Sequence, residues 1–325
     1  MYRYPIEESE PNMKMQRFPR RWFVGFCLGL LLTVGLGSWQ VVRSQDSPDA
    51  ETFALTPIDL SLNPETDSSG KVPQGLSISP SPVPDGERAV IGEDDRVLMT
   101  SGAYPWSAIG RVEQYDIRGQ LEGWCTGTLI GRNTVLTNAH CVIDANTHQL
   151  TDREMVFRPN VIRGRSSDTA KAIAVEYGTN FNDGRVADDW ALIQLDEPLG
   201  EYYGEIGWLV PAIERPEVLE ILQNKLNLVG YSFDFPDNAP GYAPGNTPGI
   251  HRNCSILGLA SDDRLLHDCD TNSGASGATL LGRLASGKYV ILGLHAGAAE
   301  TNTGDIINYG MQVDRWQNTA REMMR

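Results

Sequence analysis

The sequence predicts an all-β fold, either a barrel or a sandwich, for the part of the chain from about residue 90 onward. Short runs of apolar or alternating residues follow one another there, and turn residues separate each run from the next. The clearest runs are residues 126–130, 155–157, 192–195, 226–229, 279–281 and 289–294. Many short strands joined by frequent turns are typical of all-β barrels and sandwiches.

The last residues of the chain predict a helix that closes the domain. Val313, Trp316, Ala320 and Met323 recur at nearly helical spacing, which would place them on one face. We therefore expect one folded domain at residues 90–325, mostly β, with a C-terminal helix.

The N-terminal region divides into three further segments. Residues 1–21 are polar and basic, and residues 22–42 contain no charged side chain. Twenty-one uncharged residues are just long enough to cross a bilayer as a helix, with the N-terminus in the cytoplasm. The alternative is a secretory signal that is cleaved. Either interpretation predicts an exported domain, in a periplasm or outside the cell.

Residues 43–89 lack apolar periodicity and are rich in Ser, Asp and Pro. Such a segment buries too little apolar surface to offset its ordering entropy, which predicts a disordered linker. A propeptide that is removed near residues 88–92 is the alternative.

The net charge and the cysteine count bear on the class of function. The chain has 325 residues and a net charge of −15, which argues against nucleic-acid binding. One of its five cysteines, Cys27, lies in the hydrophobic segment. The other four, which permit three pairings, lie in the predicted domain.

A candidate nucleophile stands in the stretch Cys269-Asp270-Thr271-Asn272-Ser273-Gly274-Ala275-Ser276-Gly277-Ala278. Glycines on both sides of Ser276 let the backbone turn tightly and approach a ligand. The backbone N–H groups of Gly274 and Ser276 could then form an oxyanion hole.

Two upstream motifs supply the partners that such a serine needs. His140 ends a short apolar run in Thr137-Asn138-Ala139-His140-Cys141, and Asp189 precedes the apolar stretch Trp190-Ala191-Leu192. A serine hydroxyl becomes a nucleophile when an imidazole takes its proton and a carboxylate holds the imidazole's tautomer. The chain order His, Asp, Ser is that of the chymotrypsin-like fold.

On these three motifs the chain from about Val90 resembles the trypsin-like serine peptidases, and in particular their glutamyl-endopeptidase-like bacterial branch. The resemblance implies two six-stranded antiparallel β-barrels with the active site between them. The motif context favours disulfides Cys125–Cys141 and Cys254–Cys269, which would persist in an oxidising compartment.

Two site positions have neighbouring rivals. Ser273 also follows Cys269 at a plausible spacing, but Thr271 stands two residues before it, where Gly274 stands before Ser276. We therefore predict Ser276 as the nucleophile. Asp188 competes with Asp189, and the Asp-x-Ala-Leu pattern selects Asp189.

The resemblance also indicates a substrate pocket. Thr271 and His295 occupy the positions at which a threonine and a histidine hold the substrate carboxylate in glutamyl endopeptidases. A hydroxyl and an imidazole are suitable donors for that role. Asp270 could instead favour a basic substrate residue.

The sequence therefore predicts an exported, monomeric serine endopeptidase that acts on proteins or peptides, with a preference for cleavage after Glu or Asp. No metal or organic cofactor is expected. If residues 22–42 are not cleaved, they would attach the protein to a membrane. The alternatives are a catalytically silent binding module displayed at the membrane, and an esterase that uses the same triad.

Overall fold

A computed structural model describes residues 57–58, 90–237, 239–301 and 303–325. The segments predicted at 1–21 and 22–42, and all of 43–89 except two residues, lie outside the described part of the chain. Within that part, no helix is long and apolar enough to cross a membrane.

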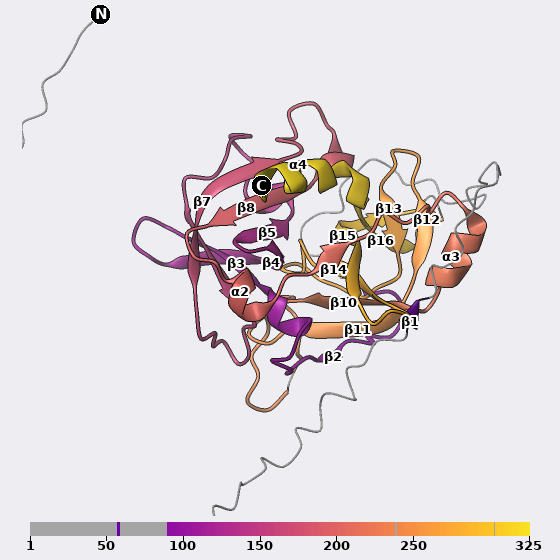
Figure 1. The fold of residues 1–325 in the computed structure, drawn as a ribbon, viewed down its shortest axis with the longest axis horizontal. Helices are drawn as coiled ribbons and strands as arrows, with labels where there is room; N and C mark the ends of the chain where they lie inside the picture. The colour runs from indigo at the N-terminus through magenta and orange to yellow at the C-terminus, as the bar shows by residue number, and fades with distance from the viewer. Residues whose placement is uncertain (1–56, 59–89, 238, 302) are drawn as a thin grey trace, which may run out of the picture. The chain divides into compact units, whose positions relative to one another are not determined.

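The N-terminal half of the domain forms a closed six-stranded antiparallel barrel. Its hydrogen-bonded order is β3-β4-β5-β8-β7-β6, drawn in purple to pink on the left of Figure 1. The strands are β3 Ile109–Tyr115, β4 Leu121–Gly131, β5 Thr134–Thr137, β6 Glu154–Pro159, β7 Ala170–Tyr177 and β8 Ala191–Leu195. This barrel confirms the prediction for the first half of the fold.

The C-terminal half forms a second sheet in which ten strands take part. Its main path, β12-β13-β16-β15-β14-β10-β11-β2, lies on the right of Figure 1. The strands are β2 Val97–Leu98, β9 Gly207–Trp208, β10 Leu226–Gly230, β11 Gly249–Cys254, β12 Ile256–Leu259, β13 Leu265–His267, β14 Thr279–Leu284, β15 Tyr289–Glu300 and β16 Ile306–Met311, together with the two-residue β1. Near the two ends of this path, β11 and β12 are separated in the chain only by Ser255. The ladder therefore returns to its start through β10, as the expected six-stranded barrel requires.

Strand β1, Pro57–Ile58, departs from the expectation for residues 43–89. Its two residues pair in parallel with Arg283 and Leu284 of β14. The segment was expected to lack regular structure because it has no apolar periodicity, but backbone pairing with an existing strand needs none.

Helices in the described residues are few and short: α2 Gly200–Tyr203, α3 Pro216–Leu222 and α4 Gln317–Met323, with four single-turn 3₁₀ helices. The predicted C-terminal helix is confirmed as a 3₁₀ turn, Val313–Arg315, followed by α4. Val313, Trp316 and Ala320 are fully buried, as their spacing required. Met324, just after α4, lies against the backbone of Gly131 at the end of β4, so the chain's end packs on the first barrel.

Candidate active site

His140 and Asp189 are brought together by two paired strands of the first barrel. Strand β5 ends at Thr137, which pairs with Ala191 at the start of β8. His140 lies in the 3₁₀ turn that follows β5, and Asp189 lies two residues before β8. Since antiparallel partners end and begin at the same edge, the two side chains meet there.

The Asp189 carboxylate makes two hydrogen bonds to His140. Its Oδ2 lies 2.7 Å from His140 Nδ1, and its Oδ1 accepts the His140 backbone N–H at 3.0 Å. Asp189 is 5% exposed, whereas the His140 side chain is 38% exposed. A carboxylate that accepts from Nδ1–H leaves the lone pair of neutral imidazole on Nε2, which can then take a proton.

Asp188 has a different environment from Asp189. Its carboxylate faces Arg185 at 3.5 Å and Arg315 at 3.4 Å, at a partly exposed position. The geometry therefore agrees with the choice of Asp189 as the partner of His140.

The turn that carries Ser276 is fastened to strand β4 through Thr126. The Thr126 N–H donates to Ser276 O at 2.8 Å, and the Thr126 hydroxyl donates to Gly274 O at 2.9 Å. Gly274 has φ +92° and Gly277 has φ +84°, values that side-chain-bearing residues rarely adopt. The two glycines thus permit the turn that the sequence predicted.

Two peptide planes in this turn are oriented by hydrogen bonds on their carbonyl sides. Ser273 O accepts the Phe233 N–H at 2.7 Å, and Ala275 O accepts the Ala278 N–H at 2.8 Å. Because C=O and N–H point in opposite directions across a trans peptide, the N–H groups of Gly274 and Ser276 are directed away from these partners. Within the described part of the chain, neither N–H donates to a protein group.

A disulfide connects strand β4, to which the turn carrying Ser276 is hydrogen-bonded, with the 3₁₀ turn that carries His140. Cys125, next to Thr126, is bonded to Cys141, which follows His140. Ser276, at the start of the second sheet, therefore lies beside the part of the first barrel that carries His140. The second predicted pairing, Cys254–Cys269, is also confirmed.

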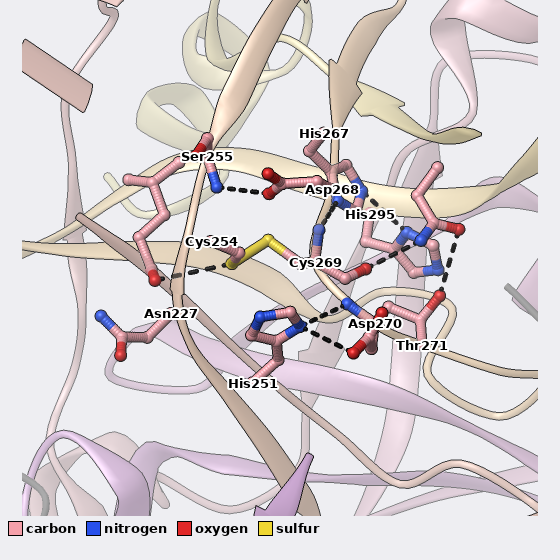
Figure 2. The surroundings of a disulfide bond; sticks show 12 residues. Asn227, His251, Cys254, Ser255, His267, Asp268, Cys269, Asp270, Thr271 and His295 are labelled. Atoms are coloured by element: carbon pink, nitrogen blue, oxygen red, sulfur yellow. Dashed lines mark hydrogen bonds and ion pairs between the residues drawn. A yellow bond between two sulfur atoms is a disulfide. The ribbon is translucent and has the colours of Figure 1, made fainter. Parts of the chain in front are cut away.

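The predicted specificity residues Thr271 and His295 are both buried, in part of the network that Figure 2 shows. The Thr271 hydroxyl lies 3.4 Å from Asn308 Oδ1, and Asn308 Nδ2 donates to Cys269 O at 2.8 Å. His295 is tied to the serine turn, since its carbonyl accepts the Gly277 N–H at 3.1 Å and its N–H donates to Ala278 O at 2.8 Å.

The His267 ring lies next to the His295 ring (Figure 2). His267 Nε2 is 3.0 Å from His295 Nδ1, and His267 Nδ1 accepts the Cys269 N–H at 3.3 Å. With Nδ1 as acceptor, a neutral His267 carries its hydrogen on Nε2 and donates it to His295 Nδ1. His295 therefore carries its own hydrogen on Nε2. The sequence gave no signal for this pairing.

Burial keeps both histidines neutral. It lowers the pKa of His295 to about 3, and nearby His140 adds to the shift. Burial also lowers the pKa of His267 well below its ordinary value, with a further contribution from His295. The pair can therefore donate a hydrogen bond but carries no charge near neutral pH.

Asp270, adjacent to Thr271, is 1% exposed and binds the N-terminal segment of the domain. Its Oδ1 accepts the Ile91 N–H at 2.8 Å and its Oδ2 accepts the Asp95 N–H at 2.9 Å. Its own N–H donates to His251 Nδ1 at 2.7 Å (Figure 2). A buried carboxylate that already accepts two backbone hydrogen bonds is a poor counter-ion for a basic substrate residue.

Three groups in the described residues have metal-ligand composition. Two of them contain cysteines whose sulfur atoms form the disulfides. In the third, Asp95–His251–Asp270, the lone pair of His251 Nδ1 is used by the Asp270 N–H and the Asp270 oxygens by backbone donors. These bonds occupy the groups that a metal would need.

Comparison with known proteins agrees with the geometry. Residues 99–217 match the trypsin family, a stretch that includes His140 and Asp189. A glutamyl endopeptidase of Bacillus licheniformis is 24% identical over 255 residues, which cover 75% of this chain and 73% of the relative. Serine protease 23 of Mus musculus is 25% identical over 222 residues, and the chain spans about half of that relative's length.

A solved structure of a Glu endopeptidase in complex with MPD has the same fold. It superposes with a TM-score of 0.57 at 21% identity and covers 72% of this chain and 99% of the solved chain. Residues 99–217 therefore match the trypsin family, and the chain has the chymotrypsin-like fold.

Proposed function

We propose that this chain is an exported endopeptidase that hydrolyses peptide bonds through His140, Asp189 and Ser276. The observation that carries the proposal is the 2.7 Å contact between Asp189 Oδ2 and His140 Nδ1, together with Gly274 and Ser276 N–H groups that have no acceptor among the described residues. These are the positioned base and the oxyanion donors that acyl transfer requires.

The reaction follows from these groups. His140 Nε2 takes the hydroxyl proton as Ser276 Oγ attacks the peptide carbonyl, and Asp189 stabilises the imidazolium that forms. The Gly274 and Ser276 N–H groups bind the carbonyl oxygen as it becomes negative. His140 then donates the proton to the leaving amine, and water hydrolyses the acyl-enzyme by the same steps.

The nucleophile can be identified by mapping the adduct of a fluorophosphonate on the full chain. We expect the adduct on Ser276, in the wild type and in the matched variant Ser273→Ala, and none in Ser276→Ala. An adduct on Ser273 would exclude this assignment of the turn. No adduct on well-folded protein would instead favour the silent binding module.

The same site supports a preference for an acidic substrate residue. His295 Nε2–H is a neutral donor. The Thr271 hydroxyl is a second donor. It now lies 3.4 Å from Asn308 Oδ1, so a substrate carboxylate would have to replace that acceptor. A hydrogen bond to a charged acceptor contributes about 1.5–3 kcal/mol, against about 0.5–1.5 kcal/mol for a neutral one. Two neutral donors therefore favour a carboxylate over an amide.

This preference is tested by comparing peptides that differ only in Glu or Gln before the cleaved bond. We expect kcat/KM to be about tenfold higher for Glu, since about 1.4 kcal/mol is a factor of ten. In His295→Ala, the value for Glu should fall while that for an Ala-containing peptide changes little. Equal values for Glu and Gln in the wild type would contradict the proposal.

Export is supported by the two disulfides, which persist outside the reducing cytosol. Attachment to a membrane through residues 22–42, removal of residues 43–89 and a monomeric state stay predictions. Mass spectrometry of the exported protein, with and without membrane separation, would decide the first two.

A further inference from the structure

Trp124, on strand β4 beside Cys125, contacts Tyr231 and Phe233, which lie against the turn that carries Ser276. Its indole N–H donates to Tyr231 O at 2.7 Å, and its ring meets the Phe233 ring edge-on with centroids 4.3 Å apart. Phe233 is the residue whose N–H binds Ser273 O and so orients the peptide that carries the Gly274 N–H. Trp124 thus contacts both Tyr231 and Phe233, on the segment that binds the turn carrying Ser276.

The turn itself lies against these groups. A Cβ atom at Gly274 would be 2.5 Å from Tyr231 O, 3.0 Å from Trp124 Nε1 and 3.2 Å from the Phe233 ring. The backbone of the turn therefore packs directly on the indole N–H and its acceptor. A shift of the indole would move the surface on which Gly274 rests.

Trp124 is in turn fixed by a buried cation. The Arg111 guanidinium stacks over its ring at 3.9 Å and is itself 2% exposed. Arg111 Nη2 is 3.0 Å from Glu113 Oε1, and Glu113 is fully buried. Both charged groups are thus buried, so the plane on which the indole lies is set by an ion pair that solvent does not reach.

A long loop fixes the indole from another direction. Arg111 Nη1 donates to Gly245 O and to Asn246 Oδ1, each at 3.2 Å. A Cβ atom at Gly245 would be 2.1 Å from Trp124 Cζ2, so the loop backbone touches the ring where no side chain would fit. The loop between β10 and β11 therefore packs against Trp124.

We propose that Trp124, clamped by Arg111 and Gly245, is a positioning residue for the oxyanion hole. It acts through Tyr231 and Phe233 on the direction of the Gly274 N–H. This inference rests on the proposed function, in which that N–H binds the developing oxyanion. It assigns Trp124 no contact with substrate.

The test uses Trp124→Phe in the full chain, because phenylalanine keeps a ring and removes the N–H donor. The matched control is Trp208→Phe, which makes the same change beside Trp316 in the second sheet, where the two ring centroids are 5.3 Å apart. Steady-state kinetics on one peptide and the affinity of a peptide boronic acid of matched sequence are measured for each. The boronic acid forms a tetrahedral adduct on the serine.

We expect Trp124→Phe to lower kcat about ten- to hundredfold with KM nearly unchanged, since loss of a whole oxyanion donor costs about 10²–10³. Affinity for the boronic acid should fall by a similar factor, and Trp208→Phe should change neither. A role confined to stability would lower the melting temperature without this kcat-selective loss. Unchanged kcat and unchanged boronic-acid affinity in folded Trp124→Phe would overturn the inference.

Two further measurements distinguish failure of the proposed function from failure of the inference about Trp124. Labelling of the wild type by a fluorophosphonate at Ser276 is required first, because its absence refutes the proposed function and the inference with it. If Trp124→Phe does not fold, Arg111→Lys replaces it, since lysine keeps the charge beside Glu113 but loses the flat stacking on the indole. A several-fold loss of boronic-acid affinity is expected there, and none would refute the inference.

Discussion

At the scale of single residues, two adjacent aspartates differ in what they contact. Asp189 binds His140, while Asp188 faces Arg185 and Arg315. We expect Asp189→Asn to lower kcat by about 10³–10⁴, because an amide no longer fixes the imidazole tautomer. Asp188→Asn is the control and should stay within a few-fold of the wild type in the same peptide assay. A comparable loss in both variants would argue against the triad.

The buried pair His267–His295 predicts how stability depends on pH. Both pKa values are lowered in the folded protein, that of His295 to about 3. As the pH falls below the unfolded value of about 6.5, only the unfolded chain gains these protons, so the free energy of unfolding decreases down to about pH 3. Urea unfolding between pH 7 and pH 4 should show a shallower decrease in His267→Gln than in the wild type.

The residues proposed for the triad could be selected from sequence because each stands in a short local motif next to an apolar run or in a glycine-rich turn. His267, Asn308 and His251 could not, because their importance comes from strand pairing. His267 pairs with Asn308 across β13 and β16, and His295 pairs with Gly310 across β15 and β16. Nothing local in the sequence specifies that register.

At the scale of elements, the serine and histidine turns depend on the Cys125–Cys141 bridge, which spans 16 residues. We expect the double variant Cys125→Ala/Cys141→Ala to lose about 3 kcal/mol of unfolding free energy, from the loop-closure entropy that the bridge removes from the unfolded chain. It should also lose activity, since the bridge lies between Thr126 and His140. Denaturant unfolding and peptide hydrolysis measure the two effects, and full activity in the variant would show that strand pairing alone aligns the turns.

Element types were more predictable than their assembly. Strand-forming runs such as 126–130 and 289–294 lie in β4 and β15, and the spacing of Val313, Trp316 and Ala320 indicated the C-terminal helix. Periodicity could not show which strands pair, or that β11 and β12, separated only by Ser255, pair with different neighbours. Nor could it show β1, whose pairing with β14 is made by the backbone.

At the scale of the whole molecule, Asp270 joins the N-terminal segment of the domain to the stretch that precedes Ser276. It accepts the N–H groups of Ile91 and Asp95 and stands next to Thr271. We expect Asp270→Ala to lower stability by about 1–3 kcal/mol for each donor left unpaired and to raise KM more than it lowers kcat. Glu93→Ala, in the same segment, is the control for lost charge. Thermal unfolding measures the loss of stability, and steady-state kinetics measure kcat and KM. An unchanged KM would show that Asp270 does not affect the proposed substrate pocket at Thr271 and His295.

The separation of 179 positions between Ile91 and Asp270 has a consequence for how the protein is made. The ribosome adds Ile91 well before Asp270, and Ser276 follows later still. A chain that is still being synthesised therefore lacks both the partner of Ile91 and the proposed nucleophile. The proposed activity can be present only after both Asp270 and Ser276 have been added.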